Sequence, residues 1–116
     1  MKEEKFKIIQ FIKEFILRVE KELDNFPKKD IEIKNRIKTN SYDLLEICYE
    51  ANTCTDVQNK VKLLEKSIAK IKTIDFLLDL SYERELISHK KVLKLGLRMD
   101  DIIKYISGWL KKIKEE

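Results

Sequence analysis

The chain is short of the two residues that most often build turns. Its 116 residues include 2 glycines and 1 proline, whereas 40% of the residues are charged and 43% are hydrophobic. Because glycine and proline are the usual residues of tight turns, this scarcity indicates a few long elements with short connections. Long charged side chains at this density are typical of exposed helix faces, so we expect an all-α fold. The scarcity of glycine also excludes a glycine-rich loop that could cradle a phosphate.

Long apolar runs are also missing. No stretch approaches the ~20 consecutive apolar residues that a membrane-spanning helix needs, so we expect no membrane partner. The opening residues MKEEKFKIIQ place acids before the apolar part and offer no small-residue cleavage site, which argues against a secretory signal. Cys48 and Cys54 are six residues apart, with no CxxC motif and no histidine nearby. Both are predicted to be free thiols in a reducing cytoplasm, which is the expected location.

Signals of catalysis or metal binding are equally sparse. The single histidine, His89, could be a general base, a metal ligand or an exposed residue in the first turn of a helix. The third role is favoured because no cysteine or carboxylate cluster stands beside it at ligand spacing. Asp75 and Asp79 share a helical face, and we interpret them as partners of Lys or Arg across a helix interface. We therefore expect no enzyme activity, no catalytic residues, no cofactor and no metal.

Hydrophobic periodicity predicts four helices. The clearest pattern covers about residues 88–114, where apolar residues recur at alternating steps of three and four. This stripe comprises Val92, Leu95, Met99, Ile102, Ile106, Trp109 or Leu110, and Ile113. Ser88 stands at the N-cap position, and Trp109 is predicted to pack in the core. With three further helices at about residues 2–25, 29–51 and 56–82, residues 1–116 are predicted to form one domain, an up-down-up-down antiparallel four-helix bundle.

Further apolar residues lie away from these stripes. A lone bundle needs one apolar stripe per helix, and a second stripe left in water would favour aggregation. We therefore predict that the chain is a subunit of a homo-oligomer; the alternative is that these are scattered surface residues. The predicted oligomer interface comprises Phe6, Leu17, Ile31, Tyr42, Leu45, Tyr49, Phe76, Leu77, Leu80, Leu93 and Leu97.

Basic residues gather on two segments. The formal net charge is +4, and most of the excess falls in the last predicted helix. A line of cations can follow a phosphate backbone, and a tyrosine can stack on an unpaired base. Two groups are therefore predicted to bind RNA or DNA, namely Lys90, Lys94, Arg98, Tyr105 and Lys112 on one helix face, and Lys28, Lys29, Lys34, Arg36 and Lys38. The alternative is a solvated helix face, and Asp101 interrupts the first group.

Four segments of the chain resemble a known family. They are NFPKKDIEIKNRI from Asn25, LLEICYEAN from Leu44, LLEKSIAKIKTIDFLLDLSYERELIS from Leu63, and SGWLKKIK from Ser107. This pattern is similar to the accessory variability determinant (Avd) proteins of diversity-generating retroelements. It is also similar to a related group that intervening sequences in bacterial ribosomal RNA genes encode.

The resemblance implies a four-helix protomer that assembles into a barrel-like homopentamer with a basic surface. It implies a non-enzymatic accessory protein that associates with a reverse transcriptase and its template RNA and supports mutagenic synthesis of complementary DNA. The intervening-sequence group implies an alternative, a self-assembling structural or RNA-binding module. Avd proteins often carry arginines near the end of the third helix, where this chain has Asp75 and Asp79.

Overall fold

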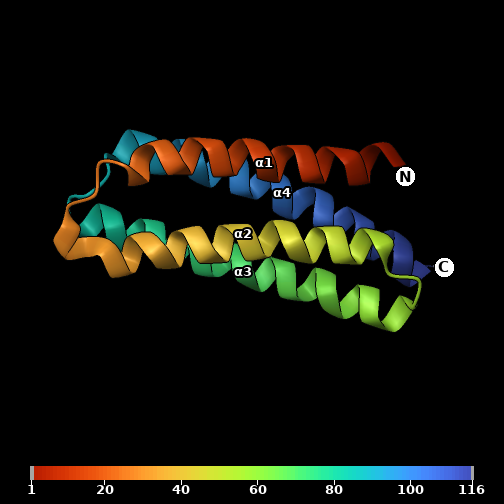
Figure 1. Cartoon of the computed structure of the whole chain (residues 1–116). Helices are drawn as coiled ribbons and strands as arrows, with labels where there is room; N and C mark the ends of the chain where they lie inside the picture. Colours follow the sequence, from red (N-terminus) through yellow and green to blue (C-terminus); the bar gives the residue numbers. More distant parts are fainter. Residues whose placement is uncertain (1, 116) are drawn as a thin grey trace.

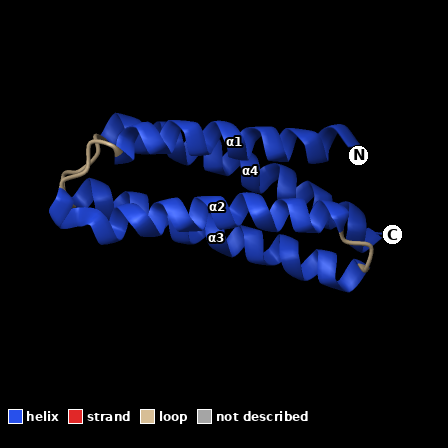
Figure 2. Cartoon of the chain, viewed as in Figure 1, coloured by secondary structure: helices blue, strands red, loops and turns tan. Residues whose placement is uncertain are grey.

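Four long helices make up most of the computed structural model, which describes residues 2–115 and the side chains from residue 7 onward. They are α1 (Lys2–Leu23), α2 (Ile31–Thr53), α3 (Val57–Glu83) and α4 (His89–Glu115). The helices pack against one another, and residues 2–115 contain no strand (Figures 1 and 2). The predicted all-α class is confirmed, and each helix begins and ends within two residues of its predicted bounds.

Capping side chains mark the starts of two helices. The Ser88 hydroxyl accepts a hydrogen bond from the backbone N–H of Lys91 at 3.3 Å, which confirms the predicted N-cap of α4. The Asp56 carboxylate caps α3 in the same way, by accepting from the backbone N–H of Gln58 at 3.3 Å. The start of α2 differs from the prediction, because a single 3-10 turn, η1 (Lys28–Asp30), separates Pro27 from the α-helix.

Each helix contacts two neighbours. α1 packs against α2 and α4, α3 packs against the same two helices, and the pairing of α2 with α3 is the most extensive. The turn between α1 and α2 and the turn between α3 and α4 lie at one end of the molecule, and the α2–α3 turn lies at the other (Figure 1). The molecule extends 47 × 23 × 19 Å, so most of its surface consists of long helix faces.

The core lies between the apolar stripes of the four helices. On α4 the whole predicted stripe is buried, and Trp109 keeps 3% of its surface exposed. α1 contributes Ile8, Ile12, Phe15, Val19 and Leu23, all fully buried. Each such side chain stabilises the fold by about 1.5–3 kcal/mol relative to an exposed one. Charged residues occupy the outer faces, and within residues 2–115 no helix has the apolar length to cross a membrane.

Three serines are buried in α2 and α3. Ser41, Ser67 and Ser81 donate hydrogen bonds of 2.7, 2.6 and 2.8 Å to backbone carbonyl oxygens of their own helices. These bonds satisfy the hydroxyl groups away from water. Small side chains let two helices approach closely, which fits the extensive contact between α2 and α3.

Candidate nucleic-acid interface

The basic residues predicted around the start of α2 do not form one surface. Lys28 and Lys29 are exposed on η1, at the end of the bundle. Lys34 and Lys38 are half-buried and lie one turn apart on α2. Arg36 lies about 200° around the helix from Lys34, since two residues separate them. Its Nε lies 3.7 Å from a glutamate carboxylate one turn earlier on α2. The cluster is therefore divided among three directions.

The basic residues of α4 lie more nearly together. Lys90, Lys94 and Lys112 are exposed on its outer face. Arg98 turns toward α1, where its Nη1 lies 3.8 Å from Oε2 of Glu14. Lys90, Lys94 and Arg98 therefore form a run of cations along α4 whose inner edge meets α1, and Asp101 separates this run from Lys112.

Tyr105 belongs to the contact between α1 and α4. Its ring centroid lies 5.3 Å from that of Phe11, with the two planes inclined at 61° in an edge-to-face arrangement. The Nζ atom of Lys7 lies 6.0 Å from the Tyr105 centroid. Tyr105 is partly buried against the core, so the contact with α1 covers part of its side chain and leaves the rest accessible. The prediction that this ring stacks on an unpaired base stays a prediction.

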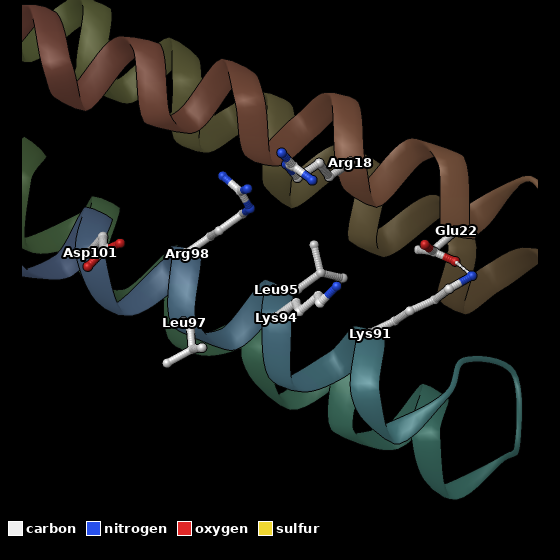
Figure 3. Close-up of a pocket in the computed structure, with 8 residues that line it drawn as sticks. All are labelled: Arg18, Glu22, Lys91, Lys94, Leu95, Leu97, Arg98 and Asp101. Atoms are coloured by element: carbon white, nitrogen blue, oxygen red, sulfur yellow. Dashed lines mark ion pairs between the residues drawn. The ribbon is translucent and has the colours of Figure 1, made fainter.

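Basic side chains from two helices line a groove between α1 and α4 (Figure 3). It encloses about 470 Å³. Its lining residues are Arg18 and Glu22 from α1, and Lys91, Lys94, Leu95, Leu97, Arg98 and Asp101 from α4. Four cations and two carboxylates give the groove a positive balance.

Two of the four cations are compensated by carboxylates of α1. Lys91 Nζ lies 2.9 Å from Oε1 of Glu22, and Arg98 makes the longer contact with Glu14. Among the described residues, Arg18 and Lys94 form no ion pair. The guanidinium groups of Arg18 and Arg98 point toward one another from the two helices (Figure 3). Two cations held on opposite walls favour an anion between them.

Arg18 was not among the predicted site residues. It lies on α1 one residue beyond Leu17, at a position where the sequence gives a polar face with mixed charge. Its contribution depends on α4 being the neighbour of α1 on that side, which no periodicity within α1 reveals. The sequence offered one indication of this role, namely that Arg18 lies next to the buried stripe of α1.

The carboxylates of α3 have different neighbours from those predicted. Partial burial and the nearby carboxylates of Asp79 and Asp100 raise the pKa of Asp75, and Lys72 on the same helix lowers it. The charge of Asp100 on α4 therefore acts against ionisation of Asp75, and the cation that favours it, Lys72, belongs to α3 itself. Within residues 2–115, no three His, Cys, Asp or Glu side chains form a group that could hold a metal ion. The ring of His89 is exposed and lies 5.3 Å from that of Tyr82.

Most residues of the predicted oligomer interface are exposed. The exposed set is Leu17, Ile31, Tyr42, Tyr49, Phe76, Leu93 and Leu97, each with 43–66% of its surface accessible. Leu45 and Leu80 are partly buried against the core. Leu77 is buried at 8% and leaves the predicted interface, because its position between Ile74 and Ser81 turns it inward with them. The side chain of Phe6 lies outside the described residues.

Comparisons of the chain with models of protein families, with curated proteins and with solved structures find no match. The likeness to the Avd proteins therefore rests on the sequence segments given above.

Proposed function

We propose that this chain binds the phosphate backbone of single-stranded nucleic acid in the α1–α4 groove. The convergence of Arg18, Lys94 and Arg98 on one groove supports the proposal. Guanidinium groups donate paired hydrogen bonds that match the geometry of phosphate oxygens, and cations along a groove gain further from counterion release. Lys90 and Lys112 extend the same positive face along α4, so a strand could follow the helix beyond the groove.

The wider role we propose is that of a non-enzymatic accessory protein of a diversity-generating retroelement, acting in the cytoplasm. The protomer would be an up-down-up-down bundle that assembles into a homopentamer and presents RNA or DNA to a reverse transcriptase. Support comes from the segments that resemble Avd proteins, the exposed apolar residues on all four helices, and the basic groove. A reverse-transcriptase gene beside the gene for this chain would agree with this role.

Salt-dependent binding of a fluorescently labelled, mixed-sequence RNA oligonucleotide tests the nucleic-acid proposal. We expect binding that weakens as salt rises, and the variant with Arg18→Ala and Lys94→Ala should bind less tightly. Each lost phosphate contact should reduce the slope of log K against log salt by about 0.7 for a single strand. Fluorescence anisotropy over a series of potassium chloride concentrations measures both quantities.

The matched control carries Lys62→Ala and Lys66→Ala, which remove two cations one turn apart on α3. Both positions line a groove between α2 and α3, away from α1 and α4. Equal losses of affinity in the two variants would show a nonspecific charge effect and contradict the assignment to the α1–α4 groove. Affinity for RNA that does not change with salt would contradict phosphate binding itself.

A second candidate function is the intervening-sequence type of module, which self-assembles and need not bind RNA. The contacts of Lys91 with Glu22 and of Arg98 with Glu14 favour it, because they offset two of the cations in the groove. This function predicts a defined oligomer with no measurable affinity for the labelled RNA even at low salt. The same anisotropy series, combined with the mass in solution, separates the two functions.

A further inference from the structure

The cations of the α1–α4 groove meet at its centre. The guanidinium groups of Arg18 and Arg98 point toward one another from the two helices, and Lys94 lies one turn before Arg98 on α4 (Figure 3). Groups of like charge repel, so this arrangement favours an anion that both guanidinium groups can contact. Among the described residues Arg18 and Lys94 form no ion pair, so both are available to that anion.

Carboxylates stand at both ends of this cationic centre. Glu22 of α1 lines the groove at one end, and Asp101 of α4 lines it at the other, three residues beyond Arg98 (Figure 3). Glu14 of α1 contacts Arg98, with 3.8 Å between Oε2 and Nη1. Glu14 and Glu22 lie four residues before and after Arg18, which is about 6 Å along the helix axis on each side. The positive centre is therefore short and has negative charge at either end.

An internal phosphate of a strand does not suit such a centre. It carries one charge, and further phosphates follow it in both directions. Those phosphates would meet Glu22 at one end of the groove and Glu14 with Asp101 at the other, which opposes like charges. A terminal phosphate carries about −1.5 to −2 charges at pH 7, has three acceptor oxygens free and has strand on one side only. Guanidinium groups on opposite walls can donate paired hydrogen bonds to these oxygens.

We infer that the α1–α4 groove binds the terminal phosphate of a nucleic-acid strand, a phosphomonoester, in preference to phosphates within the strand. Arg18 and Arg98 hold its oxygens from the two walls. The strand leaves past Lys94 toward Lys90, the exposed cation one turn away on α4, and so runs away from Asp101. The inference rests on the proposed binding of nucleic acid and names the part of the strand that the groove recognises.

Fluorescence anisotropy with RNA oligonucleotides of one sequence tests this preference. The probes carry a 5′-phosphate, a 3′-phosphate or hydroxyl groups at both ends, and the fluorophore is attached to an internal nucleotide. A hydroxyl-ended RNA lengthened by two nucleotides controls for charge, because its total charge is about that of a phosphorylated probe. A circular RNA of the same sequence offers no end at all.

We expect a terminal phosphate to increase the affinity about tenfold over hydroxyl-ended RNA, which is the gain from hydrogen bonds to one charged group. The two phosphorylated probes show which end is preferred. Arg18→Ala should bring the ratio of affinities close to one, because it removes one wall of the phosphate site. Lys90→Ala is the matched control, which should weaken binding of every probe alike and keep the ratio. Far-UV circular dichroism should show the same helix content throughout.

Removing the carboxylates at one end gives a second test, in the opposite direction. The variant with Glu14→Gln and Asp101→Asn should bind the circular RNA several-fold more tightly, because a strand can then continue past Arg98. The matched control carries Glu46→Gln and Glu50→Gln, which remove two carboxylates from a groove between α2 and α3. An equal gain in both variants would overturn the role assigned to the carboxylates of the α1–α4 groove.

Other results would overturn the end preference itself. If all RNAs bind equally and binding still weakens with salt, the groove binds internal phosphates, and the proposed function survives while this inference does not. A preference that the lengthened RNA matches, or that persists in Arg18→Ala, would also contradict it. If a nucleoside monophosphate displaces the labelled RNA as readily as phosphorylated RNA does, the groove is a site for free nucleotides. If no RNA binds at low salt, the proposed function fails together with the inference.

Discussion

The backbone N–H of Leu86 donates a hydrogen bond to the carbonyl oxygen of Ser81 at 2.9 Å and so closes the end of α3. Between them Glu85 adopts a φ of 62°, in the left-handed region. A residue with a Cβ atom loses roughly 1–2 kcal/mol in this conformation, and glycine does not. Glu85→Gly is therefore expected to raise the free energy of unfolding by about 1 kcal/mol.

Urea unfolding followed by circular dichroism measures this gain. For a domain of this size it corresponds to a melting temperature about 4 °C higher. The control is Glu83→Gly, two residues earlier in the last turn of α3, where glycine should cost up to about 1 kcal/mol. A similar loss of stability in both variants would contradict the reading of Glu85 as a strained helix terminus.

Removing the Asp75 carboxylate should stabilise the protomer. Burial and the charges of Asp79 and Asp100 raise the pKa of Asp75 above its usual 3.8. The folded chain therefore holds a proton on Asp75 more readily than the unfolded chain does, so this group lowers stability as pH rises from 3.8 through its raised pKa. Asp75→Asn should increase the free energy of unfolding at pH 7, and the gain should shrink as the pH falls toward 4. Urea unfolding at both pH values, with Glu46→Gln as the control, measures the difference.

The two cysteines should differ in reactivity. Burial raises the pKa of the Cys48 thiol from 9.0 to about 12, although a hydrogen bond with Ser67 opposes the shift. Cys54 is half-buried at the end of α2. Since the thiolate is the reactive form, iodoacetamide should modify Cys54 in the folded chain and Cys48 only after unfolding. Mass spectrometry over time measures this order, with Cys54→Ser isolating the slower site. Modification of Cys48 as fast as Cys54 would show that the α2–α3 interface opens readily.

The raised pKa of Cys48 should also lower the stability of the fold at alkaline pH. The unfolded chain loses the Cys48 proton near pH 9.0, whereas the folded chain keeps it to about pH 12. The contribution of this thiol to stability therefore falls as pH rises between those values. Cys48→Ala should remove this component of the alkaline loss, although it also deletes a buried sulfur atom. The free energy of unfolding is measured against pH for the wild type and for the variant, and both curves are expressed relative to their values at pH 7. The difference between the curves gives the contribution of the thiol.

Ser67 should tolerate a smaller side chain better than a larger one. Its side chain is fully buried, and its hydroxyl bonds to the carbonyl oxygen of Leu64 in its own helix. Ser67→Ala removes the hydroxyl with its bond to Leu64 and its hydrogen bond with the Cys48 thiol of α2, so a loss of about 1 kcal/mol is expected. Ser67→Leu inserts carbon atoms between α2 and α3 and should cost about 1–3 kcal/mol. Thermal melts of both variants give the comparison, and equal stability would mean that the interface has spare volume.

The pattern of the sequence predicted which side of each helix is buried. The α4 stripe from Val92 to Ile113 is buried as expected, because spacing of three and four residues leaves one possible inner face. Ser88 was also predictable as a cap, since its hydroxyl acts within a single turn. Properties that depend on one helix alone were therefore accessible from the sequence.

Properties that depend on the contact between two helices could not be predicted from the sequence. Tyr105 has the spacing of an outward residue, yet its ring packs on Phe11 of α1. Arg18 joins the basic groove because α4 lies beside it, and Leu77 turns inward because the core of α3 includes Ile74 and Ser81. The left-handed conformation of Glu85 had no signal either, because glycine or asparagine usually marks that position.

The pairing of α2 with α3 has a consequence for how the chain folds. Three residues join these helices, so closing the loop costs little entropy, and their contact is the most extensive in the bundle. We expect this helical hairpin to form first and to keep the slowest amide hydrogen exchange, with α1 and α4 opening at lower free energy. Early in synthesis α1 would therefore have no helix to pack against. The core would form only after α4 has left the ribosome.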